Sequence, residues 1–555
     1  MMKTQQELTL LKLDFNERSD AVPQWLNLQS INPNKLWQYP NKERLQQIIC
    51  DKFSISKEQL LVTNGGDEAI ELLFKSAKIE KKTIVLPLPA FSQYWSGVQN
   101  WQLNAKYIEP LEDMRLDIQT LIESIEEDSI VIVTSPNNPT GEQIPIETVE
   151  RICKKAQQKN SWVLLDQAYI EFTGNIETGL DLIDRYRNLL LLRSLSKAYG
   201  LAAIRLGYLM ADKALIAQLQ KLSMPFNVSA LNLEIAQLAF SEEARYEVKS
   251  YCNKIAQNRQ LVQSYLLPFN IKVVESGANF LFLQGDSNKL RLIDRSCQRF
   301  NIQIKNNLVG LSRTRSVFAL RITIPYNIER LLAALQLALK PDLLCFDMDG
   351  VLIDTSESYD QCIKKTVKVF TGVDVNSEQV SEVRARGGFN NDWKLTQQLI
   401  AELGSEINYQ DIIETFQHFY QGDDENPGFK SKEKPLLESA LKKKIFVDKT
   451  REINTAVVTG RPKIEALEGL DLLSIKNTNL ISDDDVNQSK PDPEGINKVK
   501  RFFNAENCWM LGDSPDDMLA AKSAGAIAIG IGSDNLYQFG ADLVLNNVNQ
   551  LESLI

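Results

Sequence analysis

Histidine is nearly absent from this chain of 555 residues, which contains a single one, His418. Histidine is the commonest general base and a frequent zinc ligand, so its scarcity excludes multi-histidine zinc sites, and it excludes Ser-His-Asp triads unless His418 itself serves. Catalysis must therefore depend on lysine, aspartate, tyrosine, arginine or a cofactor. His418 lies in a polar and aromatic stretch, residues 416–420, and we expect it at the surface or on a helix face.

Paired cysteines and long apolar runs are also lacking. The seven cysteines are scattered and form no CxxC pair, a pattern typical of reduced, buried thiols in a cytoplasmic protein. No apolar run reaches the roughly 18 residues of a membrane-spanning helix, and the first residues lack the apolar segment of a signal peptide. The net charge of −10 argues against nonspecific binding to nucleic acid or to an anionic membrane. We therefore expect small-molecule substrates.

Short apolar runs alternate with amphipathic helical stretches through most of the chain. Such runs occupy residues 83–86, 129–134, 162–165 and 189–192. Short buried strands between helices are typical of a parallel sheet, so the pattern predicts an α/β fold. Residues 227–267 are helical and polar in pattern, and strands are predicted at 278–283 and 317–324, followed by a helix over 327–339.

A boundary is predicted near Lys340 and Pro341, because proline cannot continue the preceding helix. Residues 1–340 would form one enzyme, with a large domain at about 30–225 and a small domain made by the N-terminal arm and about 226–340. Residues 341–555 would form a second α/β unit, with strands at 343–346, 455–458, 508–511 and 526–531. The segment at about 356–441 is mostly helical in pattern.

Several short motifs in the first unit follow predicted strands or open predicted helices. Each alone also fits a plain turn, a capped helix or a solvated surface lysine. Together they supply what pyridoxal phosphate needs: a lysine for its aldehyde, a carboxylate for its ring nitrogen, and N–H groups, hydroxyls and an arginine for its phosphate. The motifs are Asn64-Gly65-Gly66-Asp67-Glu68, Pro89-Ala90-Phe91-Ser92-Gln93-Tyr94, Ser135-Pro136-Asn137-Asn138-Pro139-Thr140-Gly141, Asp166-Gln167-Ala168-Tyr169, Arg193-Ser194-Leu195-Ser196-Lys197 and Arg205-Leu206-Gly207.

In this order, over about residues 8–340, the motifs resemble the fold-type-I pyridoxal-phosphate aminotransferases, and within them the histidinol-phosphate aminotransferase branch. The resemblance implies that Lys197 is the Schiff-base lysine and proton shuttle, and that Asp166 is the partner of the pyridine nitrogen. It assigns Asn138 and Tyr169 to the ring hydroxyl, and Tyr94 to stacking on the ring. The implied phosphate site consists of Gly66, Asp67, Ser194, Ser196 and Arg205, joined by Tyr39 from the neighbouring subunit of a homodimer.

Arg321 resembles the substrate-binding arginine of this family. A guanidinium fork suits an α-carboxylate and equally a phosphate monoester, while the alternative is a surface arginine on a strand.

Three departures from the family pattern stand out. Asn16-Glu17-Arg18-Ser19 lacks the usual Asn-Pro, Gln167 stands where an acid is usual, and Pro325 stands in place of a glycine region. The first and last lie near the residues that shape the substrate pocket.

The second unit contains four further strings, three of them at or just after predicted strand ends. They are Asp347-Met348-Asp349-Gly350-Val351, Thr459-Gly460-Arg461, Lys490-Pro491-Asp492-Pro493 and Gly512-Asp513-Ser514-Pro515-Asp516-Asp517. A calcium loop starting at Asp347 would need oxygen ligands where Val351 and Ser358 stand, so that interpretation fits poorly. In this order, over about residues 342–555, the strings resemble the haloacid dehalogenase (HAD) superfamily.

This second resemblance implies a Rossmann-like phosphatase domain with a helical cap at about 356–441. Asp347 would attack phosphorus, and Asp349 would protonate the leaving alcohol and then activate water. Thr459 and Lys490 would hold the phosphoryl oxygens. Magnesium would be bound by Asp347, by the Asp349 carbonyl and by Asp513, with Asp517 supporting that shell. Within the cap, the string from Arg384 to Trp393 is either a reader of the substrate or a turn between helices.

The pairing of the two units suggests a bifunctional enzyme. It would interconvert imidazole-acetol phosphate and histidinol phosphate with glutamate and 2-oxoglutarate, and then remove a phosphate, as two steps of histidine synthesis. HAD-type histidinol phosphatases carry a Cys/His zinc loop, whereas His418 has no cysteine cluster near it. Another phosphorylated amine or a generic sugar phosphate therefore stays open as the phosphatase substrate.

Two other functions stay open at this point. One is a phosphothreonine decarboxylase-like activity in the first unit, because those enzymes share the same cofactor motifs. The other is a regulatory scaffold with degenerate sites, against which the complete sets of catalytic residues argue.

Overall fold

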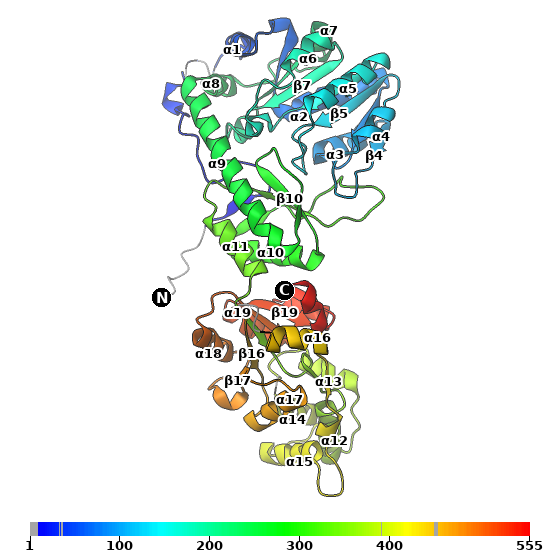
Figure 1. The fold of residues 1–555 in the computed structure, drawn as a ribbon, viewed down its shortest axis with the longest axis vertical. Coiled ribbons are helices and arrows are strands. Elements are labelled where there is room, and N and C mark those ends of the chain that lie inside the picture. The colour runs from blue at the N-terminus through cyan, green and yellow to red at the C-terminus, as the bar shows by residue number, and fades with distance from the viewer. Residues whose placement is uncertain (1–8, 33, 35–36, 390, 449–452) are drawn as a thin grey trace. The chain divides into compact units, whose positions relative to one another are not determined.

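The fold is described from a computed structural model that covers residues 9–32, 34, 37–389, 391–448 and 453–555. The chain divides into two compact units (Figure 1). One comprises Met1–Leu290 with Cys297–Leu332, and the other comprises Arg291–Ser296 with Ala333–Ile555. The division falls before the predicted boundary at Lys340, and the finer domain limits stay predictions. The α/β fold class is confirmed, and each unit is built on its own sheet.

The first unit is built on a seven-stranded sheet, in the order β2-β8-β7-β6-β5-β3-β4. Strands β3 to β7 run parallel to their neighbours, whereas β8 pairs antiparallel with both β7 and β2. The strands are β2 (Leu60–Thr63), β3 (Thr83–Pro87), β4 (Ala105–Ile108), β5 (Ser129–Thr134), β6 (Trp162–Asp166), β7 (Leu189–Ser194) and β8 (Gly207–Ala211). Four of the apolar runs in the sequence predict these strands to within two residues.

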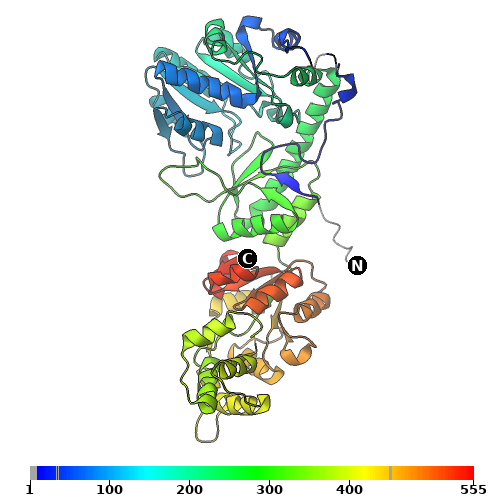
Figure 2. The same ribbon diagram turned by 180° about the vertical axis from the view of Figure 1, so that it is seen from behind.

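Helices cover both faces of this sheet (Figure 2). Successive residues of β5 alternate between two cores: Ile130 and Ile132 face one, and Val131 and Val133 face the other. Helices α2, α3 and α7 contribute to the first core, and α4, α5 and α6 to the second. These helices, with α1, are α1 (Glu43–Phe53), α2 (Gly65–Glu80), α3 (Ser92–Asn100), α4 (Ile118–Glu123), α5 (Ile146–Gln158), α6 (Leu180–Arg185) and α7 (Lys213–Gln220).

The rest of the first unit is a smaller α+β region. Strands β9 (Lys272–Val273), β10 (Phe280–Gln284) and β12 (Leu320–Thr323) form an antiparallel sheet. The N-terminal arm joins this region, because β1 (Leu11–Leu13) pairs in parallel with β11 (Ile302–Ile304). The helices are α8 (Ala230–Leu238), α9 (Glu242–Leu266), α10 (Ser287–Arg299) and α11 (Glu329–Leu339), and the end of α11, from Ala333, belongs to the second unit.

The second unit has a six-stranded parallel sheet, in the order β17-β16-β13-β18-β19-β20. Its strands are β13 (Leu343–Phe346), β16 (Asn454–Val458), β17 (Asn479–Ile481), β18 (Cys508–Gly512), β19 (Ile527–Ile531) and β20 (Leu543–Leu545). The accompanying helices are α16 (Ser439–Lys442), α17 (Lys463–Leu472), α18 (Glu494–Phe503) and α19 (Pro515–Ser523).

The predicted helical cap is a bundle with a hydrophobic core of its own. Its helices are α12 (Tyr359–Thr371), α13 (Ser377–Arg384), α14 (Asp392–Glu402) and α15 (Tyr409–Gln421). The chain enters and leaves the cap through two short antiparallel strands, β14 (Ile353–Asp354) and β15 (Lys434–Pro435). His418 is exposed on α15, as expected.

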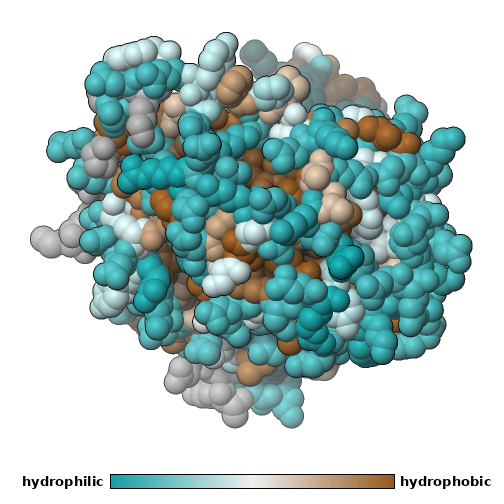
Figure 3. All heavy atoms as spheres, turned by 90° about the horizontal axis from the view of Figure 1, so that it is seen from above, coloured by the Kyte–Doolittle hydropathy of each residue, from teal (hydrophilic) through white to brown (hydrophobic). Residues whose placement is uncertain are grey.

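Hydrophilic residues predominate on the face shown in Figure 3, with hydrophobic ones visible between them. Among the described residues, no helix combines the length and the apolar character needed to cross a membrane. All seven cysteines are buried and none forms a disulfide, as expected from their spacing.

Candidate active sites

The candidate site in the first unit is a cavity of about 430 Å³ at the carboxyl ends of the central strands. Thr134 ends β5, Asp166 ends β6 and Ser194 ends β7, and all three line the cavity. In open α/β sheets the ligand site lies at this edge, because the loops that follow parallel strands meet there. The cavity brings together nine of the residues predicted from the motifs: Gly66, Asp67, Asn138, Asp166, Tyr169, Ser194, Ser196, Lys197 and Arg205.

Lys197 follows β7 and extends toward the N-terminal arm. Its Nζ donates a hydrogen bond to the Phe15 carbonyl oxygen at 2.8 Å. Burial, and after it the nearby charge of Arg321, lowers the pKa of this amine to about 8. A lysine with such a pKa has a substantial unprotonated fraction near neutral pH, which is the form that attacks an aldehyde.

Asp166 is a buried carboxylate at the base of the cavity. Tyr94 Oη donates to its Oδ2 at 2.8 Å, and the Ala168 N–H donates to its Oδ1 at 3.0 Å. Burial raises the pKa of Asp166, while these two donors act against that shift. A buried carboxylate with two fixed donors suits a protonated ring nitrogen, which would add the missing positive charge.

Donors to a phosphate gather at the start of α2. Gly66 and Asp67 belong to its first turn, where backbone N–H groups have no partner within the helix. Arg205 reaches this end and donates from Nη2 to Asp67 at 2.6 Å, and from Nη1 to Ser196 Oγ at 3.4 Å. Gly65 has φ +74, and a Cβ there would lie 2.7 Å from Arg205 Nη2, so the approach requires glycine.

Asn138 and Tyr169 form the opposite side of the cavity. Asn138 Nδ2 donates to Tyr169 Oη at 3.3 Å, and Asn16 Nδ2 donates to the same oxygen at 2.9 Å. Asn16 is also bonded to Thr323, and so ties the N-terminal arm to β12. The string that starts at Asn16 and departs from the family pattern therefore adjoins the cavity, because Glu17 lines its wall.

Arg321 projects from β12 and is 7% exposed. Its Nη1 donates to Asn138 Oδ1 at 2.6 Å, its Nη2 donates to the Asp14 carbonyl, and its Nε has no partner. A buried guanidinium with an unused donor fits the predicted anion-binding role better than the alternative of a surface arginine.

Two aromatic assignments change in the structure. Tyr94 is fully buried and does not line the cavity, so the prediction that it stacks on the cofactor ring is corrected: it lies behind Asp166. Phe91, just before α3, lines the cavity instead. Tyr39 is 81% exposed and stacks on Phe226 with ring centroids 4.5 Å apart, outside the cavity of its own chain.

The candidate site of the second unit is a group of buried charges at the end of β13. Lys490 Nζ donates to Asp347 Oδ1 at 2.7 Å and to Asp517 Oδ1 at 2.6 Å. Ligand oxygens of Asp347, Asp513 and Asp517 all lie within 4.8 Å of one another, close enough to share one cation. Three carboxylates around one lysine leave an excess of negative charge, which fits a divalent cation with oxygen ligands.

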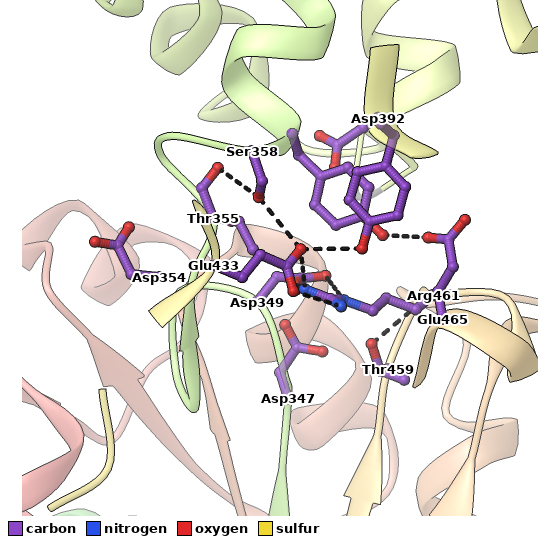
Figure 4. Close-up of polar contacts among 12 residues, drawn as sticks. Asp347, Asp349, Asp354, Thr355, Ser358, Asp392, Glu433, Thr459, Arg461 and Glu465 are labelled. Carbon is purple, nitrogen blue, oxygen red and sulfur yellow. Dashed lines mark hydrogen bonds and ion pairs between the residues drawn. The ribbon is translucent and has the colours of Figure 1, made fainter. Parts of the chain in front are cut away.

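Asp349 points away from this group toward Arg461, as Figure 4 shows. Arg461 Nη2 donates to Asp349 Oδ1 at 2.6 Å and to Glu433 Oε1 at 3.1 Å. Glu433 precedes β15, where the chain leaves the cap, and accepts further hydrogen bonds from Ser358 and Tyr420 of the cap. The Arg461 side chain, 2% exposed, therefore joins the predicted acid to the cap, a contact that sequence reasoning missed.

Thr459 directly follows β16 and is buried. Its Oγ1 accepts a hydrogen bond from the Arg461 N–H at 3.2 Å, which fixes the loop after β16. Its position beside the Lys490 loop agrees with the predicted phosphoryl site, because both residues line one small pocket.

Of the two interpretations of the cap string from Arg384 to Trp393, the structure shows the turn between helices, and the reader of the substrate stays a prediction; Asn390 lies outside the described residues. The string is the turn between α13 and α14, and Asn391 caps α14. It also approaches the core, where the Gly388 N–H donates to Asp516 Oδ1 at 2.8 Å. Asn391, Asp392 and Trp393 line a cavity together with Asp349.

Comparisons with known proteins agree with this division. Residues 13–335 match the family described as aminotransferase class I and II, and residues 344–531 match that described as haloacid dehalogenase-like hydrolase. A histidinol-phosphate aminotransferase from Caldanaerobacter subterraneus subsp. tengcongensis is 30% identical over 327 residues, which cover 56% of this chain and 88% of that protein.

Two solved structures show the same fold as the first unit. The histidinol-phosphate aminotransferase from Clostridium acetobutylicum aligns with a TM-score of 0.53 at 24% identity, over 59% of this chain and 99% of that one. The histidinol-phosphate aminotransferase from Sinorhizobium meliloti, solved in complex with pyridoxal-5'-phosphate, aligns with a TM-score of 0.52 at 22% identity, over 59% of this chain and 90% of that one.

Proposed function

The chain belongs to the class I and II aminotransferase family and continues into a HAD-like hydrolase, and from this premise we propose a bifunctional enzyme. The first unit would transfer an amino group to and from a phosphorylated compound with the aid of pyridoxal phosphate. The second would hydrolyse a phosphate monoester with the aid of Mg²⁺. The observation that carries the first half is the convergence of Lys197, Asp166 and Arg205 on one cavity.

Pyridoxal phosphate, when bound, supplies an aldehyde that condenses with amines and a ring that withdraws electrons. Lys197 Nζ would anchor the aldehyde and then move a proton between two carbons of the substrate. Asp166 would hold the proton of the ring nitrogen, with Tyr94 fixing its carboxylate. Phe91 would pack against the ring, in the role first expected of Tyr94.

The remaining cavity residues would position cofactor and substrate. The first turn of α2, Ser194, Ser196 and Arg205 would bind the phosphate of the cofactor, and Asn138 with Tyr169 would donate to its ring hydroxyl. Arg321 would bind the carboxylate of glutamate and the phosphate of the second substrate in turn. The relatives named histidinol-phosphate aminotransferase support imidazole-acetol phosphate as that substrate, and hence a place in histidine synthesis.

In the second unit, Asp347 Oδ1 would attack phosphorus and displace the alcohol, to form an aspartyl phosphate. Asp349 would give its proton to the departing alkoxide and then take one from the water that hydrolyses the aspartyl phosphate. Lys490 and Thr459 would bind the phosphoryl oxygens. Asp347, Asp513 and the Asp349 carbonyl would hold Mg²⁺, supported by Asp517, and the metal would neutralise phosphoryl charge.

We also propose that the enzyme is a homodimer in which Tyr39 completes the partner's phosphate site. Its 81% exposure, and its place outside the cavity of its own chain, support a role across an interface. Mixing Tyr39→Phe chains with Lys197→Ala chains should form hybrids in which one cavity has both native residues. Transamination recovered on mixing the inactive Lys197→Ala chain with the weakened Tyr39→Phe chain would support the proposal, and no recovery from a mixed dimer would contradict it.

A coupled assay tests both activities in the full chain. With imidazole-acetol phosphate, glutamate and Mg²⁺, the wild type should release 2-oxoglutarate and free phosphate. Lys197→Ala should abolish the first product, and Asp347→Asn should abolish phosphate release from an added ester while transamination continues. Carbon dioxide release in place of amino transfer would favour the decarboxylase alternative, and a protein that takes up no pyridoxal phosphate would refute the first half.

A further inference from the structure

A second cavity, of about 190 Å³, lies in the second unit between the cap and the core. It opens beside Asp349, the group proposed to protonate the departing alcohol. Its cap wall is formed by Tyr359, Asp392 and Trp393, and its core wall by residues near Arg461. A leaving alcohol has to lie next to its proton donor, so this cavity is the space available for the organic part of a phosphate ester.

The walls of this cavity are strongly acidic. Besides Asp349, they include Asp392, Glu465, Asp483 and Asp484. Figure 4 shows Asp392 and Glu465 approaching from the cap and the core respectively. None of these four belongs to the carboxylate group at Asp347 that would bind the metal, so Mg²⁺ at that group would not neutralise them.

The cations around the cavity are already engaged. Arg461 is shared by Asp349 and Glu433, with Nη2 at 2.6 Å and 3.1 Å from their oxygens. Arg384 is likewise shared by two carboxylates, Asp360 and Asp392, at 2.9 Å each.

Lys463 is paired with Asp485 at 2.6 Å. Because Asp485 does not line the cavity, this ion pair involves no carboxylate of the cavity wall. Glu465 and Asp483 are instead bound by neutral groups: Tyr359 and Gln417 donate to Glu465, and Ser489 donates to Asp483. Among the described residues, the cavity therefore carries an excess of negative charge.

Such a cavity would repel an anionic alcohol and attract a cationic one. Burial already raises the pKa of Asp392 to about 6 and raises that of Glu465, so both carboxylates would gain from a neighbouring cation. The rings of Tyr359 and Trp393 add faces that favour a positive group. The neutral or anionic alcohol of an ordinary sugar phosphate would find no matching charge.

We propose that the phosphatase unit is specific for phosphate monoesters whose alcohol carries a protonated amine, bound by the acidic cavity between the cap and Asp349. The inference rests on the proposed phosphatase function and assigns its substrate class. It also places the unit in a reaction sequence, because a step that adds an amino group to a phosphorylated ketone would supply such a substrate. The first unit is proposed to catalyse a step of that kind.

The test compares two esters of equal size in the full-length enzyme with Mg²⁺. O-Phosphoethanolamine ends in an ammonium group, and n-propyl phosphate ends in a methyl group at the same position. We expect kcat/KM at least tenfold higher for the amine, and N-acetylation of the amine should remove the advantage. Equal rates for the two esters, or a preference for the neutral one, would overturn the proposal.

Two variants test which residues produce the preference for the amine ester. Asp483→Asn/Asp484→Asn removes two charges from the wall, and should lower the ratio of kcat/KM for the amine to that for propyl phosphate several-fold. Asp471→Asn, on the exposed side of α17, is the matched control and should leave the ratio as in the wild type. An unchanged ratio in the double variant would count against these residues as the source of selectivity.

Hydrolysis of p-nitrophenyl phosphate distinguishes a failure of the inference from a failure of the proposed phosphatase function. If its hydrolysis depends on Asp347 but the amine has no advantage over propyl phosphate, the phosphatase function stands and the inference fails. If no ester is hydrolysed by the wild type with Mg²⁺, the phosphatase function itself fails.

Discussion

Tyr94 Oη donates a hydrogen bond to Asp166 Oδ2 at 2.8 Å; Asp166 lines the first cavity, and Tyr94 is buried behind it. The tyrosine hydroxyl is a permanent donor here, because burial and the charge of Asp166 raise its pKa well above the usual value. It therefore fixes the carboxylate that would face the ring nitrogen, and does so from the side opposite the cofactor.

Tyr94→Phe keeps the ring and removes only this donor. A hydrogen bond to a charged group contributes about 1.5–3 kcal/mol, so we expect kcat for transamination to fall by roughly ten- to a hundredfold. A tyrosine that merely stacked on the cofactor would tolerate this change. Phe91→Leu instead removes the ring that is proposed to pack against the cofactor. It should weaken cofactor affinity, measured by absorbance titration.

The pH dependence of cofactor uptake follows from Lys197. Its pKa is lowered to about 8, so the reactive unprotonated amine increases as the pH rises and makes up half of the total at that value. The rate of pyridoxal phosphate uptake by the apoenzyme should therefore rise with pH, with a midpoint near pH 8. Arg321→Met removes one cause of the lowered pKa and should move the midpoint upward, whereas Arg313→Met, an exposed arginine, should not. A midpoint near that of free lysine in the wild type would refute this account.

Magnesium should stabilise the second unit. Asp347, Asp513 and Asp517 repel one another, and a cation that binds only the folded state at a hundred times its Kd adds about 2.7 kcal/mol. Thermal unfolding should show a rise of roughly 5–10 °C for this unit on addition of Mg²⁺. Asp513→Asn should reduce the rise, and Asp471→Asn should preserve it. An equal rise in both variants would mean that the cation binds elsewhere.

Gly350 lies against the same group of carboxylates. Its φ is +67, and a Cβ would lie 2.0 Å from Asp513 Oδ2. Gly372 has a similar φ of +72 and nothing within 4 Å of a Cβ, so it is a matched control. Gly372→Ala should cost about 1–2 kcal/mol of unfolding free energy through the backbone alone. Gly350→Ala should cost more and also abolish phosphatase turnover, so equal urea midpoints for the two variants would contradict the predicted clash.

Much of both sites could be predicted because the chemistry lies at strand ends. Short apolar runs mark β6, β7 and β13, and the residues that follow them reach the same edge of each sheet. The assignment of Tyr94 to stacking on the cofactor ring failed for a local reason. Phe91 and Tyr94 are three residues apart at the start of α3, and their spacing alone does not tell which one faces the cavity.

The Arg461 contacts could not be predicted for a different reason. Its partners Asp349 and Glu433 are distant in sequence, and such pairings depend on how the cap returns to the core. The same applies to the acidic cavity, whose wall combines Asp392 of the cap with Asp484 of the core. A sequence read in order shows each carboxylate in its own loop, but not that they surround one space.

The indole N–H of Trp509 donates to the Leu337 carbonyl at 3.0 Å, so the last turn of α11 is part of the core of the second unit. Anyone who produces the phosphatase half separately should therefore start the shortened chain before Ala333 rather than at Pro341. A later start would leave the fully buried indole N–H of Trp509 without its acceptor, at a cost of about 1–3 kcal/mol of unfolding free energy. Poor solubility of such a fragment would then reflect where it was cut, and would say nothing about whether the two halves depend on each other in the cell.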